Sequence, residues 1–181
     1  MRQYSLAIKT FICVLLLSLS TGMNVHAGNG IESAGEVLTA LLPATALGLT
    51  VGYKDGEGML QFGLSSALTL GVTYGLKSTV IETDPNGNSY SFPSSHTSIS
   101  FSSAEFIRKR YGWLYGLPSY AAATFVAVSR VTSREHYIQD VAAGAAIGIL
   151  SSCIFTQPFK GWLIQPEVGE KHYGLRLGHA W

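Results

Sequence analysis

Four stretches without a charged residue most constrain what this chain can fold into. Each is 17 to 19 residues long, near the length that an α-helix needs to cross the hydrocarbon core of a bilayer. Their many Ser, Thr and Gly residues leave open an alternative, in which they are buried helices of a soluble α-helical domain. We predict an all-α fold, a transmembrane bundle of about five to six helices. The four stretches are Val37–Tyr53, Met59–Leu76, Trp113–Ser129 and Val141–Phe159.

The composition also favours a membrane protein over an ordinary soluble domain. Of the 181 residues, 13% are charged and 47% are hydrophobic, and the mean hydropathy is positive. The net charge of +1 offers no basis for nucleic-acid binding. Cys13 and Cys153 lie inside apolar runs, so we expect neither to form a disulfide or to bind a metal, and no Cys/His cluster has zinc spacing.

The two ends of the chain differ from its middle. Residues 1–27 resemble a secretory signal peptide, with basic residues, an apolar core and a small-residue cleavage site. The alternative is an uncleaved first membrane helix. Residues 28–159 then form the helical domain, and residues 160–181 form a polar tail. Alternation of apolar residues with Gly and Arg across residues 173–178 is strand-like, but we expect an irregular or interfacial tail.

Three of the apolar runs contain glycines four residues apart. This spacing allows two helices to approach closely in a membrane. The pairs are Gly48/Gly52, Gly71/Gly75 and Gly144/Gly148.

A shorter and more polar helix is predicted from His96 to Ile107, with one face toward a polar site. It ends at Arg108–Arg110, the strongest basic cluster in the sequence. Basic clusters tend to stay on the cytoplasmic side of a membrane, so residues 77–95 and 130–140 are predicted on the exported side. A signal that exports residue 28 predicts the same arrangement.

The stretch from Phe92 to Thr97 has the features of a helix start that binds an anion. Pro93 fits near a first helical turn, and Ser94 or Ser95 can cap it. The first N–H groups of a helix are unpaired and carry partial positive charge, so they can hold a phosphate. His96 would lie beside that phosphate, and an imidazole suits proton transfer near neutral pH.

Two further clusters on the same side complete a site for phosphoryl transfer. His136 and Asp140 are four residues apart, so on a helix they share a face. A carboxylate there fixes the tautomer of the histidine and leaves its other nitrogen as a nucleophile. Lys77 and Arg130 can neutralise phosphate oxygens. We therefore predict phosphoryl transfer without a metal.

These residues carry a family resemblance. Lys77-x6-Asp84-Pro85, Pro93-Ser94-Ser95-His96 and Ser129-Arg130-x5-His136-x3-Asp140 resemble the three signature motifs of the type 2 phosphatidic acid phosphatase (PAP2) family, as a small bacterial membrane-associated member. The third motif matches fully. Ser95 stands where the family usually has glycine. The backbone N–H is present with either residue. Asp84 stands where the family has arginine, and an acidic group facing inward would repel phosphate.

The resemblance implies a fold, a site and a mechanism. The fold is the helical bundle shared with acid phosphatases and haloperoxidases, with the site at the outer membrane face and six membrane helices if residues 8–23 count as the first. His136 would become phosphohistidine, Asp140 would orient it, and His96 would act as general acid and then base. The phosphate would be held by Lys77, Ser94, the Ser95 N–H and Arg130. No metal and no other cofactor is expected.

The leading hypothesis is a metal-independent phosphatase that removes a terminal phosphate from a lipid-linked phosphomonoester or pyrophosphate. It would act at the exported face of a bacterial inner membrane, with a phosphorylated lipid and the membrane as partners, and no obligate protein partner is evident. Three alternatives stay open: a soluble periplasmic acid phosphatase, a vanadate-dependent haloperoxidase, and a non-catalytic membrane protein whose site has decayed.

Overall fold

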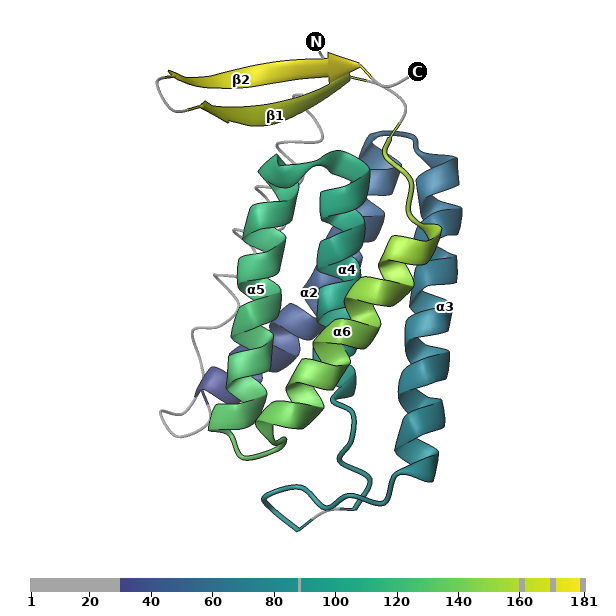
Figure 1. The fold of residues 1–181 in the computed structure, drawn as a ribbon, viewed down its shortest axis with the longest axis vertical. Helices are drawn as coiled ribbons and strands as arrows, with labels where there is room; N and C mark the ends of the chain where they lie inside the picture. The colour runs from purple at the N-terminus through teal and green to yellow at the C-terminus, as the bar shows by residue number, and fades with distance from the viewer. Residues whose placement is uncertain (1–29, 88, 160–161, 170–171, 180–181) are drawn as a thin grey trace.

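The computed structural model describes residues 30–87, 89–159, 162–169 and 172–179. The predicted signal peptide or first membrane helix, residues 1–27, lies outside the described residues. Five α-helices run roughly along one direction in the described part (Figure 1). They are α2 (Gly30–Gly52), α3 (Gly56–Thr79), α4 (Ser95–Tyr111), α5 (Trp113–Thr132) and α6 (Ile138–Phe155). The helical bundle confirms the all-α prediction.

Each charge-free run forms a helix, and most helices extend past the run into polar residues. α2 begins seven residues before Val37, and α3 continues three residues beyond Leu76. The last run and its helix are offset from each other. α6 begins at Ile138, three residues before the run, and ends at Phe155, so residues 156–159 are not helical. By length and composition, α2 and α6 could cross a membrane.

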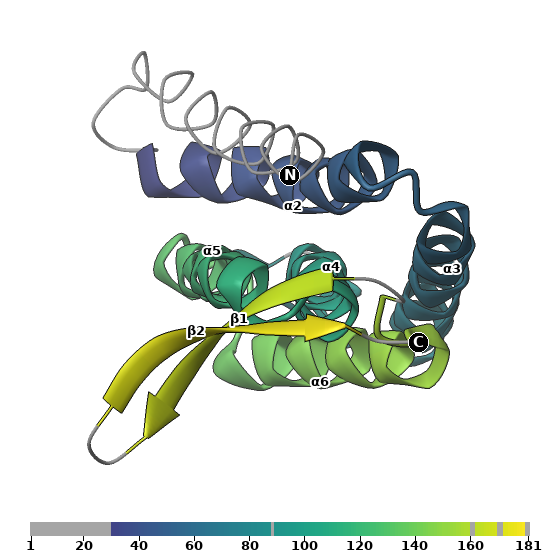
Figure 2. The same ribbon diagram turned by 90° about the horizontal axis from the view of Figure 1, so that it is seen from above.

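The polar helix α4 lies at the centre of the bundle, where it packs against α2, α3, α5 and α6 (Figure 2). The sequence predicted a helix with one face toward a polar site, but the structure buries α4 on most sides. Two of its hydroxyl groups are paired with α3: Ser102 Oγ lies 2.9 Å from Thr69 Oγ1, and Ser98 Oγ lies 3.0 Å from Thr73 Oγ1. Such pairs satisfy polar groups between apolar helices.

Glycine allows α6 to approach α4 closely. A Cβ atom on Gly144 would collide with the carbonyl oxygen of Ser94, and one on Gly148 would collide with that of Ser98. The prediction of close packing is therefore confirmed for this pair. Among the described residues, Gly48, Gly71 and Gly75 take no part in such a contact, since a Cβ atom added at any of them would have no described neighbour within 4 Å.

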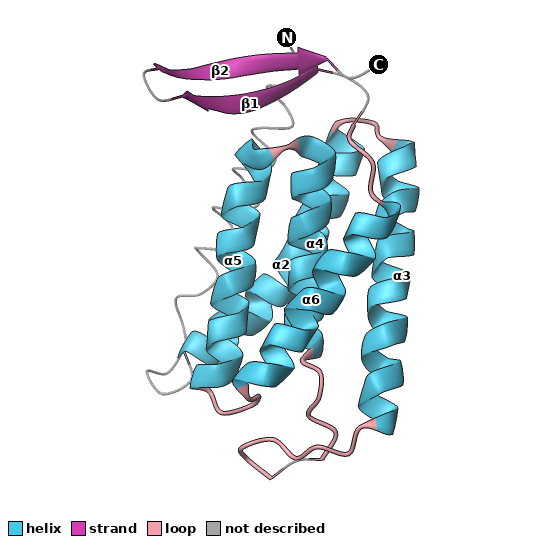
Figure 3. Cartoon of the chain, viewed as in Figure 1, coloured by secondary structure: helices cyan, strands magenta, loops and turns pink. Residues whose placement is uncertain are grey.

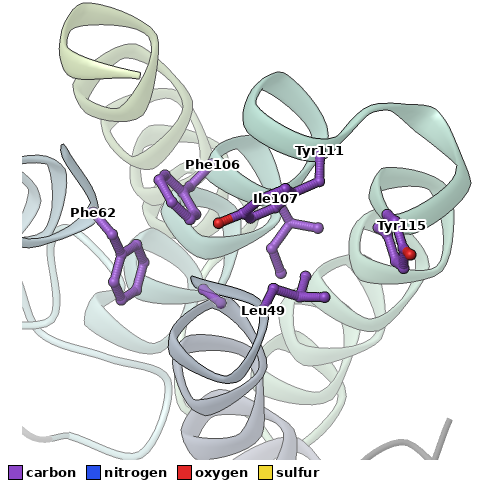
Figure 4. Close-up of a cluster of buried hydrophobic side chains, with 7 residues drawn as sticks. Leu49, Phe62, Phe106, Ile107, Tyr111 and Tyr115 are labelled. Atoms are coloured by element: carbon purple, nitrogen blue, oxygen red, sulfur yellow. The ribbon is translucent and has the colours of Figure 1, made fainter. Parts of the chain in front are cut away.

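A cluster of buried hydrophobic side chains joins α2, α3, α4 and α5 near the C-terminal end of α4 (Figure 4). Phe62 and Phe106 have ring centroids 4.9 Å apart, and Tyr53 stacks on Tyr111 at 5.1 Å. The cluster itself consists of Ala46, Leu49, Phe62, Phe106, Ile107, Tyr111 and Tyr115.

The basic cluster that ends α4 is not a free positive surface. Arg110 is buried and makes a 2.6 Å ion pair with Asp55, which precedes α3. Arg108 forms two 2.6 Å hydrogen bonds with Glu105. Lys109 donates to the carbonyl oxygen of Cys153 at 2.6 Å. Arg110 and Lys109 thus join α4 to other segments, whereas Arg108 pairs within α4. The predicted membrane topology stays a prediction.

The C-terminal segment forms two strands, β1 (Trp162–Gly169) and β2 (His172–His179), drawn in magenta in Figure 3. They pair antiparallel, from Trp162 opposite His179 to Gly169 opposite His172. The expectation of an irregular tail is wrong here, because the period-two alternation does correspond to paired strands.

Candidate active site

The seven predicted site residues lie at one end of the bundle, at the bottom of Figure 1. Helices that follow one another in the chain run in opposite directions, so this end collects the last turns of α3 and α5 and the first turns of α4 and α6. The residues are Lys77 on α3, Ser94 just before α4, Ser95 and His96 on α4, Arg130 on α5, His136 between α5 and α6, and Asp140 on α6.

His136 and Asp140 are in contact, but not through a shared helical face. α6 begins at Ile138, so His136 precedes the helix while Asp140 lies in its first turn. Asp140 is buried, and its Oδ2 accepts the backbone N–H of Tyr137 at 3.1 Å. His136 Nδ1 lies 3.4 Å from the same oxygen. Burial lowers the pKa of His136, against the opposing effect of Asp140, which favours the neutral imidazole near neutral pH.

Ser91, which the sequence analysis did not single out, joins this pair. Its hydroxyl donates to Asp140 Oδ2 at 2.6 Å and lies 3.0 Å from His136 Nδ1. All three side chains are buried. No local pattern marks Ser91, because its role depends on a loop that folds onto the start of α6.

Ser94 occupies the N-cap position of α4, although its side chain makes no capping hydrogen bond. Its hydroxyl instead accepts from Thr97 Oγ1 at 3.1 Å. Pro93 lies outside the helix, directly before the N-cap residue. The start of α4 thus keeps its N–H groups available for an anion. Among the residues that the structure describes, Nδ1 of His96 has no hydrogen-bond partner.

Lys77 connects the end of α3 to the loop that carries Ser91. Its Nζ donates to the carbonyl oxygens of Tyr90 at 2.7 Å and Ser91 at 3.0 Å. An ammonium group has three donors, so one remains for a phosphate oxygen. Lys77 also lines an open pocket of about 390 Å³ with Tyr74, Ser78 and Tyr90.

Arg130 is fully buried and is held by three groups. Nη2 donates to the carbonyl oxygen of Glu32 at 2.7 Å, Nε donates to Ser129 Oγ at 3.3 Å, and Nη1 pairs with Glu135. Gly35 makes this possible, since a Cβ atom there would collide with Ser129. The predicted phosphate ligand is therefore already paired with a carboxylate.

Glu135 is the second site residue that the sequence analysis missed. Its carboxylate lies with those of Glu32 and Glu36 so that their oxygens are within 4.8 Å of one another. Burial raises the pKa of Glu135, and a hydrogen bond with Glu32 acts in the same direction, whereas Arg130 opposes both. This side of the site is acidic, while Lys77 and the start of α4 make the other side positive.

The cations and histidines of the site lie close enough to influence one another. The charges of Arg130, His136 and Lys77 all act on His96, and those of Lys77 and Arg130 act on His136. Two histidines, two cations and a helix start meeting at one place are suited to binding and transferring a phosphoryl group.

Comparison with known families agrees with this geometry. The profile of the PAP2 superfamily matches residues 71–162, which is more than half of the chain and includes every predicted site residue. The chain belongs to the PAP2 superfamily.

Two curated proteins to which the chain is similar are named as lipid A phosphatases. The chain is 29% identical to the lipid A 4′-phosphatase of Helicobacter pylori strain J99 over 170 residues, which cover 83% of this chain and 85% of that protein. It is 33% identical to the lipid A 1-phosphatase of Porphyromonas gingivalis over 109 residues, or 55% of this chain and 24% of that protein. With the family match, these relatives make the chain a phosphoric monoester hydrolase.

The helical arrangement also matches a solved structure. The crystal structure of LpxE from Aquifex aeolicus superposes with a TM-score of 0.59 and 19% sequence identity, over 77% of this chain and 92% of that chain. At this identity the likeness establishes the fold, which is the PAP2 fold.

Asp84, which replaces the arginine of the first PAP2 motif, organises the loop between α3 and α4. Its Oδ1 accepts the backbone N–H of Asn86 at 2.8 Å, and its carbonyl oxygen accepts that of Gly87 at 3.0 Å. Aspartate forms such turns readily. Arg134, the nearest candidate in sequence to replace the missing cation, is exposed and has a positive φ of 59°.

Proposed function

We propose that this PAP2 protein removes a terminal phosphate from a lipid-linked phosphomonoester or pyrophosphate through a phosphohistidine intermediate on His136. The observation that carries the proposal is the contact of Nδ1 of His136 with a buried Ser91–Asp140 pair. An Nδ1 held in this way leaves Nε2 with its lone pair as the nucleophile. Lys77, Arg130 and His96 lie around the same group.

The proposed reaction has two steps. In the first, Nε2 of His136 bonds to phosphorus while the bond from phosphorus to the lipid oxygen breaks, and His96 gives a proton to that oxygen. In the second, His96 takes a proton from water, whose oxygen bonds to phosphorus as the phosphohistidine bond breaks. Inorganic phosphate leaves and His136 is restored.

The remaining predicted residues would stabilise charge on the transferring group. Lys77 would contribute its third donor, and Arg130 its donors not used by Glu32, Ser129 and Glu135. The Ser94 hydroxyl and the Ser95 N–H would contribute at the start of α4. Donors set in place before the reaction stabilise developing charge without reorganisation.

We propose a phosphorylated lipid of the lipid A type as the first substrate to test. The support is the 29% identity to a lipid A 4′-phosphatase over most of both chains. Phosphatidic acid, phosphatidylglycerol phosphate and undecaprenyl pyrophosphate are the other substrates to compare.

We also propose that the bundle is embedded in the inner membrane, with the site at the exported face. Large apolar side chains are exposed around the bundle, including Val51 on α2, Leu60 on α3, Leu117 on α5 and Ile154 on α6, each more than 60% exposed. Apolar surface on several sides is unusual for a soluble monomer, which favours this proposal over a soluble acid phosphatase.

Phosphate release from the four lipids by purified protein in detergent with EDTA tests the proposal. We expect release from at least one lipid, undiminished by EDTA and absent in His136→Ala. Strong inhibition by EDTA would reject the metal-free mechanism, and no release from any lipid would reject the substrate class.

A further inference from the structure

Ser91 lies between the proposed nucleophile and its carboxylate. The 3.0 Å separation of Ser91 Oγ from His136 Nδ1 is shorter than the 3.4 Å separation of His136 Nδ1 from Asp140 Oδ2. An N–H···O bond is usually about 2.7–3.2 Å long. The hydroxyl therefore provides the better-formed connection between Asp140 and the imidazole.

The direction of these bonds follows from the number of protons. An ionised carboxylate can only accept, so the 2.6 Å bond from Ser91 Oγ to Asp140 uses the single hydroxyl proton of Ser91. Ser91 Oγ can then only accept from His136 Nδ1. This requires a proton on Nδ1, and in the neutral ring the lone pair is then on Nε2.

Ser91 is held in place by its backbone as well. Its N–H donates to the carbonyl oxygen of Glu82 at 2.9 Å, and its own carbonyl oxygen accepts from Lys77 Nζ at 3.0 Å. The residue is only 4% exposed, so water does not compete for the hydroxyl. One residue thereby connects a proposed phosphate ligand, Lys77, to the proposed nucleophile.

We infer that Ser91 is a positioning residue that holds His136 in the Nδ1-protonated tautomer. Its Oγ accepts a hydrogen bond from Nδ1–H of His136, and its hydroxyl donates one to Asp140. The inference rests on the proposed function, in which His136 is the nucleophile. Loss of the hydroxyl would leave the ring free to turn or to exchange tautomers. Turnover would then fall, while binding of the phosphate by Lys77 and Arg130 would change little.

Three variants test the inference. Ser91→Ala removes the hydroxyl, Ser91→Thr keeps it, and Ser119→Ala makes the same change at a buried serine on α5 whose hydroxyl bonds the Tyr115 carbonyl of its own helix. We expect Ser91→Ala to lower kcat about ten- to a hundredfold, as for loss of a hydrogen bond involving a charged group, with KM within about twofold. Ser91→Thr should recover most of the turnover, and Ser119→Ala should match the wild type.

A spectroscopic measurement reports the tautomer without substrate. Long-range ¹⁵N–¹H spectra of labelled protein in detergent, assigned by comparison with His136→Gln, should show a protonated Nδ1 and an unprotonated Nε2 in the wild type. Ser91→Ala should show mixed or reversed signals. A wild-type ring protonated on Nε2 would overturn the inference, and so would a Ser91→Ala variant with wild-type kcat or unchanged signals. An inactive wild type with the expected signals would instead refute the proposed function alone.

Discussion

The guanidinium of Arg130 is paired with the carboxylate of Glu135, the residue directly before His136. In the PAP2 mechanism proposed above, this same guanidinium binds phosphate. An incoming phosphate must therefore compete with Glu135 or share Arg130 with it.

We expect Glu135→Gln to lower KM for a phosphorylated lipid about fivefold at neutral pH, since a nearby like charge costs an anion ~1 kcal/mol. Because burial raises the pKa of Glu135, the wild-type carboxylate loses its charge as pH falls through that value. The difference between variant and wild type should therefore shrink toward acidic pH. Glu57→Gln, at the other end of the bundle, is the control. A higher KM in Glu135→Gln would mean that Glu135 chiefly orients Arg130.

Substitutions of the two histidines should affect different steps of the reaction. We expect His136→Ala to lose turnover to below about a thousandth of wild type, together with the phosphoenzyme. His96→Ala should still form phosphoenzyme slowly from a substrate with a good leaving group, because only the protonation of that group is lost. Acid-quench trapping of labelled enzyme measures both. Phosphate trapped on His96 would reverse the assignment.

Two substitutions of Asp84 separate the effect of its charge from its role in the loop. Asp84→Asn keeps an acceptor for the Asn86 N–H and should retain wild-type kcat with a slightly lower KM. Asp84→Arg should lower KM by roughly ten- to a hundredfold if the new cation reaches the phosphate. Steady-state kinetics on both variants provide the measurement. Inactivity of both would show that the carboxylate itself takes part in the reaction.

Two glycines from runs with the same spacing should respond differently to alanine. Gly148→Ala forces a methyl group against the Ser98 carbonyl of α4 and should destabilise the bundle by about 1–3 kcal/mol. Gly71→Ala, with no described atom within 4 Å of the new Cβ, should be neutral or stabilising by up to about 1 kcal/mol. Thermal unfolding in detergent compares them. Equal loss of stability would indicate that Gly71 also lies in a close helix contact.

The positions of the helices and most of the site could be predicted from the sequence. Long charge-free runs bounded by polar residues favour helices wherever they occur, so four of them were placed from local composition. Two features of the site can likewise be recognised from residues that are close together in the sequence. They are the helix-start stretch Phe92–Thr97 and the pair of His136 and Asp140.

Only the tertiary structure decided which other groups act with them. Ser91 meets Asp140 because the loop after α3 folds against the start of α6, and Glu135 meets Arg130 because the chain turns back onto the end of α5. Such contacts leave no periodic pattern. The same reason explains why a polar helix, α4, became the buried centre, and why Arg110 paired with Asp55 instead of facing outward. A polar side chain can be buried when its partner comes from a distant segment, and the pairing is determined by the packing of the helices.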